Sequence, residues 1–128
     1  MATIQAAGGG AYPNTASLSA AQTGNAASTN IVDRGAFTGR PALLKVTTTV
    51  GATPTCTYAI EGSADGANWY SVPFADSATP TTFGFATFTI TTATTVLKLL
   101  QADQPWRYLR ITYSANTNVT NTADVWSF

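Results

Sequence analysis

The stretch EGSADGANW brings several oxygen-bearing side chains close together, those of Glu61, Ser63, Asp65 and Asn68. Oxygen ligands at such spacing could hold a cation, and the aromatic ring that follows, Trp69, could stack on a sugar. A calcium loop, however, needs several acids at alternate positions and a closing Glu. Asp65 is the only carboxylate inside the turn, since Glu61 precedes it on the incoming segment. We therefore expect no metal ion here.

The same stretch has the chemistry of a turn between two strands. Asp65–Gly66 separates two alternating runs, which is a strong local signal for a hairpin. Gly66 can adopt a positive φ at no steric cost, and the Asp65 side chain can bond to the nearby backbone. We expect Trp69 to start the return strand and to pack on the core. Sugar binding through Trp69 and Tyr70 stays open as an alternative.

Catalytic groups are scarce in the rest of the chain. The sequence has no His, which is the commonest general base and metal ligand, and a single cysteine, Cys56. Ser and Cys nucleophiles therefore lack an activating imidazole. The carboxylates are spread along the chain: Asp33, Glu61, Asp65, Asp76, Asp103 and Asp124. We expect no enzyme, no cofactor and no small-molecule substrate.

Composition narrows the classes of partner. The 128 residues suffice for one domain, and only 9% of them are charged, with a formal net charge of zero. Arg107 and Arg110 lie close together but do not form the basic stripe of a nucleic-acid binder. The sequence has no long apolar run, and we expect no signal peptide and no membrane contact. The single unpaired thiol, Cys56, fits assembly in a reducing compartment. A surface so poor in charge suggests that protein partners cover part of it.

Residues 1–29 differ from the rest of the chain in having small and polar residues and no charge. Such a segment cannot bury enough area to offset its own ordering entropy. We expect an extended N-terminal arm that becomes ordered on a neighbouring subunit, with Ile4, Tyr12 and Leu18 as anchors. A floppy tail is the alternative.

Residues 30–128 have the pattern of a β domain. Thr, Val and aromatic residues abound, and residues alternate along 42–50, with Leu44, Val46, Thr48 and Val50 on one face. Similar runs occur at 29–35, 57–62, 68–74, 83–90, 94–100, 106–115 and 124–128. The run 106–115 puts Leu109, Ile111 and Tyr113 on one face, and 83–90, apolar on both faces, is expected to be a central strand. Turn signals separate the runs, among them 51–54 and 116–118. About eight short strands predict an antiparallel β-sandwich of jelly-roll type.

Three segments together resemble a known family. They are SLSAAQTGNAASTNIVDRG (17–35), IEGSADGANWYSV (60–72) and RYLRITYS (107–114). Their order and spacing are similar to those of the capsid cement (decoration) proteins of tailed bacteriophages. Discoidin-like sugar- and lipid-binding modules share the second and third segments, but they are longer and secreted. The N-terminal STNIVDRG element favours the phage family.

The resemblance implies a jelly-roll sandwich on the outer surface of the virion, assembled in the bacterial cytoplasm. Its members bind the major capsid protein as dimers or trimers and have no catalytic residues; we favour a trimer. We expect the arm and the loops at strand ends to make the contacts. The side chains expected to contact partners are Ile4, Tyr12, Leu18, Asp65, Trp69, Arg107 and Arg110.

The alternative function is a receptor- or carbohydrate-binding module of a phage tail or of a secreted enzyme. In that case Trp69, Tyr70, Trp106 and Tyr108 would lie partly exposed on one patch.

Overall fold

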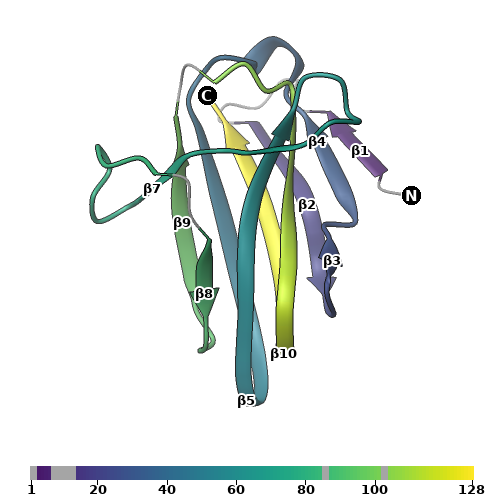
Figure 1. Ribbon diagram of the computed structural model, residues 1–128, viewed down its shortest axis with the longest axis vertical. Coiled ribbons are helices and arrows are strands. Elements are labelled where there is room, and N and C mark those ends of the chain that lie inside the picture. The colour runs from purple at the N-terminus through teal and green to yellow at the C-terminus, as the bar shows by residue number, and fades with distance from the viewer. Residues whose placement is uncertain (1–2, 7–13, 85–86, 102–103) are drawn as a thin grey trace.

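The computed structural model describes residues 3–6, 14–84, 87–101 and 104–128, and these form a single all-β unit (Figure 1). The described residues contain no α-helix, only one 3-10 helix, η1 (Gly35–Phe37). The strands are β1 (Thr3–Ala6), β2 (Asn14–Gln22), β3 (Ala26–Ala27), β4 (Asn30–Asp33), β5 (Ala42–Ser63), β6 (Tyr70–Ser71), β7 (Phe74–Asp76), β8 (Phe88–Ile90), β9 (Thr95–Leu100) and β10 (Tyr108–Ser127).

All of these strands belong to one sheet, whose main order is β1-β4-β10-β5-β9-β7. Strands β2 and β3 also pair with β10, and β6 and β8 with β5. The sheet is mixed rather than purely antiparallel, because β1 runs parallel to β4. An antiparallel sheet was predicted, and this one pair of strands corrects it.

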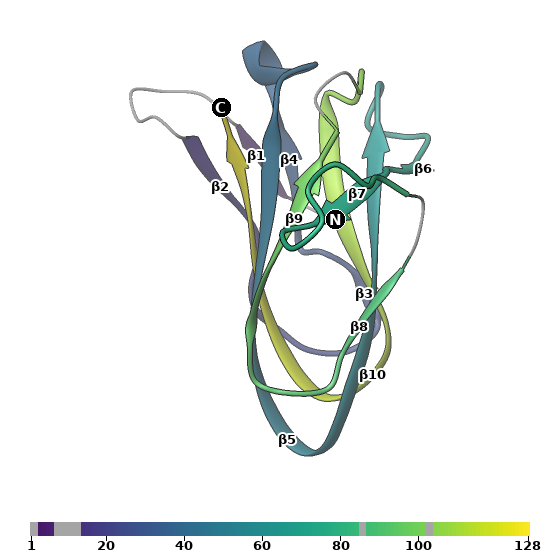
Figure 2. The ribbon, with the colours of Figure 1, turned by 90° about the vertical axis from the view of Figure 1, so that its left-hand side faces the viewer.

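Two long strands, β5 and β10, pair with each other along nearly their whole lengths. Both bend midway, so the sheet folds back on itself and its two halves face each other (Figure 2). The register shifts at the bend, between Ser114 and Val119 of β10. Thr53, Ala115 and Asn118 have positive φ there. The predicted turns at 51–54 and 116–118 are therefore bends inside continuous strands, a difference that local turn chemistry does not reveal.

The space between the two halves is the hydrophobic core. Alternate residues of β5 and β10 point into it, as the sequence pattern predicted for Leu44 and Val46 and for Leu109, Ile111 and Tyr113. Val50 was predicted on the same face as Leu44, but it lies at the bend and is 36% exposed. The buried set also includes Cys56, Tyr58, Ile60, Val72, Ile90, Val119, Ala123 and Val125.

Buried polar side chains inside this core are hydrogen-bonded to one another. The Tyr58 hydroxyl donates to Asn121 Oδ1 at 2.5 Å, and the hydroxyls of Ser19 and Tyr113 lie 2.6 Å apart. Tyr58 meets Tyr113 edge to face, with ring centroids 5.5 Å apart. A fully buried polar group costs little when it is paired in this way, so these bonds fix how the two halves of the sheet pack.

Part of the expected N-terminal arm belongs to the sheet. Strand β2 pairs with the second half of β10, and Leu18 is only 1% exposed, inside the core of its own chain. The expectation that Leu18 anchors on a neighbouring subunit is corrected, because Leu18 and Ala16 alternate inward and bury apolar area at once.

The run 83–90, predicted as a central strand, is instead peripheral. Its strand, β8, has three residues and pairs only with 56–58 of β5, and Phe83 is 37% exposed. Residues that are apolar on both faces are thus not sufficient to place a strand at the centre of a sheet.

Candidate partner-binding surface

The segments 17–35, 60–72 and 107–114 lie side by side in the structure. The start of β10 pairs on one side with β4 and on the other with the end of β5, which in turn pairs with β6. Residues that alternate with the core residues Leu109 and Ile111 point outward there. The arginine–aromatic surface, as we call it, consists of Asp33, Glu61, Trp69, Arg107, Tyr108 and Arg110.

Arg107 joins two of the three segments. Its Nε donates to Asp33 Oδ1 at 2.9 Å and its Nη2 to Oδ2 at 3.0 Å, a bidentate ion pair between the residue that precedes β10 and the end of β4. The hydrogen bonds from Arg107 hold the pKa of Asp33 below its usual value of 3.8. The same pairing raises the pKa of Arg107. The Arg107 guanidinium also lies 5.2 Å from the centroid of the Tyr108 ring.

Arg110 joins the segment 107–114 to the segment 60–72. It donates to Glu61 Oε1 at 2.9 Å, directly across the β5–β10 ladder, and Thr112 Oγ1 donates to the same oxygen at 2.5 Å. Its guanidinium lies 4.2 Å from the centroid of Trp69, a close cation–π contact. Trp69 is therefore half-buried under an arginine on the outer face, whereas it was expected to pack on the core.

The predicted turn at Asp65–Gly66 is confirmed, within a loop from Ala64 to Trp69 that joins β5 to β6. Gly66 has φ +78°, the left-handed conformation expected for it. Asp65 Oδ1 accepts hydrogen bonds from the backbone N–H groups of Ala67 and Asn68, each at 2.9 Å. These bonds lower the pKa of the Asp65 carboxyl well below its usual value. The carboxylate thus organises its own loop, as expected.

Aromatic rings continue the surface at its rim. Tyr70 is 56% exposed and stacks on Trp106, with centroids 5.5 Å apart. Trp106 in turn covers Gly62, where an added Cβ would come within 2.5 Å of the indole. Gly62 is therefore what allows the indole to lie flat against β5.

The seven side chains expected to contact partners fall in different places. Arg107, Arg110 and Trp69 belong to the arginine–aromatic surface, and Asp65 lies in the loop that joins β5 to β6, where it bonds to Ala67 and Asn68. Ile4, on β1, is 58% exposed, away from the core that holds Leu18. Tyr12 lies outside the described residues.

Sequence reasoning missed that Asp33 and Glu61 pair with the two arginines. The register of β4, β10 and β5 creates these pairs across the sheet. The sequence did place acidic and basic residues in separate predicted strands. Without the order of the strands in the sheet, however, it could not show which acid faces which arginine.

The charges of the arginine–aromatic surface are balanced in pairs. Each guanidinium of the surface is neutralised by one carboxylate, so the surface has no excess positive charge for a polyanion. Among the described residues no three His, Cys, Asp or Glu side chains gather as they would around a metal ion. No helix in that part of the chain is long and apolar enough to cross a membrane.

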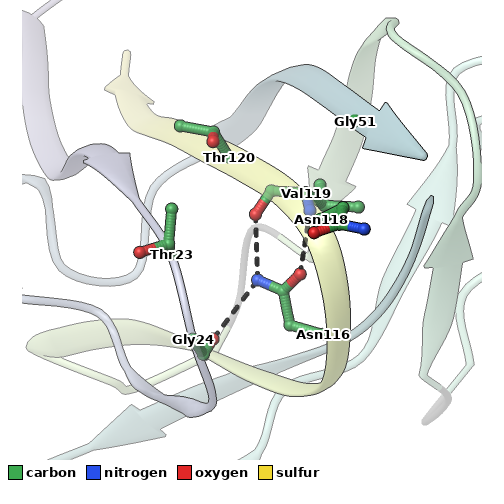
Figure 3. Close-up of a pocket in the computed structure, with 7 residues that line it drawn as sticks. All are labelled: Thr23, Gly24, Gly51, Asn116, Asn118, Val119 and Thr120. Carbon is green, nitrogen blue, oxygen red and sulfur yellow. Dashed lines mark hydrogen bonds between the residues drawn. The ribbon is translucent and has the colours of Figure 1, made fainter. Parts of the chain in front are cut away.

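A recess of about 360 Å³ lies at the bend, in the middle of the two long strands. Figure 3 shows Asn116 at its centre, with its amide donating to the carbonyls of Gly24 and Val119 and accepting from the Val119 N–H. The Asn118 amide likewise donates to the Ala52 carbonyl. Because these amides bond to the backbone, they hold the bend together and leave little for a ligand.

Comparison with known proteins adds no assignment: no protein-family model matches the chain, and no curated protein matches its sequence.

Proposed function

We propose that this chain is a structural protein of a phage particle, a capsid cement protein that binds the outer surface of the major capsid protein shell and stabilises it. The observation that carries the proposal is the arginine–aromatic surface. The three segments on which the resemblance rests form this one surface, and two ion pairs and a cation–π contact bind them to one another.

The chemistry of this surface supports protein binding. Arginine and tryptophan are the residues that most often dominate protein interfaces. Arg110 is already held by Glu61 and Trp69, so it loses little side-chain entropy when a partner docks. The exposed guanidinium of Arg107 lies beside it as a peripheral contact.

A clamp of this kind works by touching more than one shell subunit. A DNA-filled shell is under outward pressure, and its joints are the weak points. A small protein that binds only the assembled shell stabilises it by mass action, and contacts to several subunits add avidity. The charge-poor composition is compatible with extensive burial against partners.

The finer expectations belong to the same proposal. The folded sheet is assigned to the jelly-roll class of sandwich, the protein acts as a homo-oligomer, and the N-terminal arm contacts a neighbour. Ile4, exposed on β1, is one anchor of that arm, whereas Leu18 lies in the core and Tyr12 lies outside the described residues.

The test is quantitative mass spectrometry of phage particles purified from the source of this gene. We expect the chain at a fixed ratio to the major capsid protein. Particles stripped of the chain should release DNA at a lower temperature, and added purified protein should restore the higher one. Arg110→Ala and Trp69→Ala should weaken rebinding by roughly tenfold or more. Val50→Thr, an exposed change at the far bend, is the matched control and should rebind normally.

Absence of the chain from particles, or rebinding without thermal stabilisation, would refute the proposal. The competing function is carbohydrate binding, which the exposed Tyr70 ring on Trp106 favours. It would be supported instead if a glycan array gave saturable binding that Tyr70→Ala abolished.

A further inference from the structure

The outer face of the half-sheet formed by β2, β10, β5 and β9 is a second surface with an unusual arrangement of charge. Register places its outward side chains in rows across the strands. One row is Thr15, Trp126, Leu43 and Leu99; the next is Ser17, Asp124, Lys45 and Leu97; the third is Thr122, Thr47 and Thr95. We call these the three-row face.

Asp124 and Lys45 are direct cross-strand neighbours at its centre, yet they form no ion pair. The ion pairs of the described residues are Arg107–Asp33, Arg110–Glu61 and Lys98–Asp76. Lys45 Nζ lies instead over the Trp126 ring, 5.7 Å from its centroid. Within the described part of the chain the Asp124 carboxylate has no hydrogen bond; its partial burial raises its pKa, and the nearby charge of Lys45 offsets only part of that rise. A carboxylate in that position is an acceptor that a cation from outside could satisfy.

The rest of the face is apolar or hydroxylic. Leu97 is 38% exposed, and Leu43, Leu99 and Trp126 are each half-buried. At the end of the face Leu43 and Leu99 border an apolar recess of about 350 Å³, which Phe83 also lines. Leucines that stay partly exposed around one cation and one anion are typical of a surface that a protein covers.

We propose that a second copy of this chain docks on the three-row face, with its Lys45 against Asp124 and its Asp124 against Lys45. The two copies are related by a two-fold axis that runs parallel to the strands, midway between β5 and β10. Each row of one copy then faces the same row of the other copy. This axis brings Lys45 over the partner's Asp124, Trp126 over the partner's Leu43, and Thr122 over the partner's Thr47. Facing sheets commonly pack with their strands nearly aligned, as this axis requires.

Charge complementarity selects a second copy over another partner. A two-fold interface is self-complementary, so one pair of unlike groups on neighbouring strands satisfies itself twice. The middle row has that property, with its unlike charges on neighbouring strands. The other rows match themselves in the same way, because an aromatic ring faces a leucine in the first and threonine faces threonine in the third. The contact is a dimer, whereas the family resemblance favoured a trimer. It does not depend on the proposed capsid function.

A pair of charge reversals tests the contact. Lys45→Asp gives a chain with two acids at the centre of the face, and Asp124→Lys gives a chain with two bases. Each alone should dimerise at least roughly tenfold more weakly than the unmodified chain, because like charges face each other. An equimolar mixture should form a heterodimer of near-original affinity, since every facing pair is again unlike. The double variant Lys45→Asp/Asp124→Lys should also dimerise.

Sedimentation velocity gives the affinities, and native mass spectrometry separates heterodimer from homodimers. Far-UV circular dichroism checks folding; should either reversal fail to fold, Lys45→Met and Asp124→Asn replace them and should both weaken the dimer. A purified chain that stays monomeric at about 100 μM overturns the proposal. So does a mixture with no heterodimer. Neither result bears on whether the chain is present in phage particles, so this proposal and the proposed function can fail separately.

Discussion

The hydroxyl of Tyr58 is the most consequential polar atom in the core, because its only acceptor is an equally buried amide oxygen. Tyr58→Phe would leave Asn121 Oδ1 without this 2.5 Å hydrogen bond. A buried polar atom left unpaired costs about 1–3 kcal/mol. We expect the free energy of unfolding in urea to fall by that amount.

Tyr70→Phe is the control for this change. It deletes the same atom from a ring that is 56% exposed, where water replaces any lost contact. Its effect should be within about 0.5 kcal/mol of zero. Equal losses from the two variants would show that the core hydrogen bond contributes nothing special.

Gly62 is the second residue with a steep predicted response. Its added Cβ would lie 2.5 Å from Trp106 Cγ, too close for any real contact. Gly62→Ala must push the indole away, and overpacking of this kind costs about 1–3 kcal/mol. Gly84→Ala is the matched control, since a Cβ there meets nothing within 4 Å. The urea concentration at the unfolding midpoint should fall for Gly62→Ala and remain unchanged for Gly84→Ala. A fall in both variants would contradict the steric explanation.

Two aspartates should respond to pH with opposite signs. Burial raises the pKa of Asp124, so the folded chain pays a penalty for its charge at neutral pH, which disappears as the pH falls through the folded pKa. Arg107 lowers the pKa of Asp33, so that group stabilises the fold above pH 3.8, and the benefit disappears as the pH falls through its folded pKa. Lys45 is the charged residue next to Asp124, and Arg107 is the one next to Asp33.

Asparagine variants measure both effects. At pH 7, and at protein concentrations low enough to keep the chain monomeric, Asp124→Asn should raise the thermal midpoint and Asp33→Asn should lower it. Both differences should shrink in scans towards pH 3. A lower midpoint for Asp124→Asn in the monomer would mean that Lys45 already compensates the carboxylate within one chain.

At the scale of elements, the bend of β5 and β10 holds strained backbone. Ala115 has φ +49° within β10, a conformation that costs a non-glycine residue about 1–2 kcal/mol. Ala115→Gly should therefore stabilise the chain by about 0.5–1 kcal/mol, after the larger backbone entropy of the unfolded glycine chain is subtracted. Ala59→Gly, inside the straight part of β5, should destabilise it by a similar amount. Urea denaturation gives the free energy of unfolding of both variants. A lower free energy of unfolding in both would mean that the bend is not strained.

The strands also show what the sequence could and could not predict. Alternation is local, so the inward faces around Leu44 and Ile111 were predicted correctly, as was the turn at Gly66. Pairing is not local. The bends at 51–54 and 116–118 have the composition of turns, and only the pairing of β5 with β10 on either side of them makes them parts of long strands. The ion pairs of Arg107 and Arg110 escaped prediction for the same reason, because register sets them.

At the scale of the whole molecule, the boundary between arm and domain lies elsewhere than composition indicated. Residues 1–29 share small polar residues, yet β2 pairs with six residues of β10 and adds Leu18 to the core. Ser19, in the same strand, bonds to the buried Tyr113 hydroxyl. Composition averages over such a segment and misses a single large apolar residue at an inward position.

Truncation tests where the folded unit starts. A chain without residues 1–13 loses the short pairing of β1 with β4 but keeps the core. It should still unfold cooperatively on heating, with a modestly lower midpoint.

A chain without residues 1–22 loses β2, and loss of the Leu18 side chain alone costs about 2–5 kcal/mol. Together with the lost ladder and the exposed edge of β10, that approaches the 5–15 kcal/mol that stabilises a typical domain. We expect no cooperative transition by circular dichroism. Leu18→Ala in the full chain is the control and should lower the midpoint without abolishing the transition. A cooperative transition in the chain without residues 1–22 would show that β2 is dispensable, and that the arm extends as far as composition indicated.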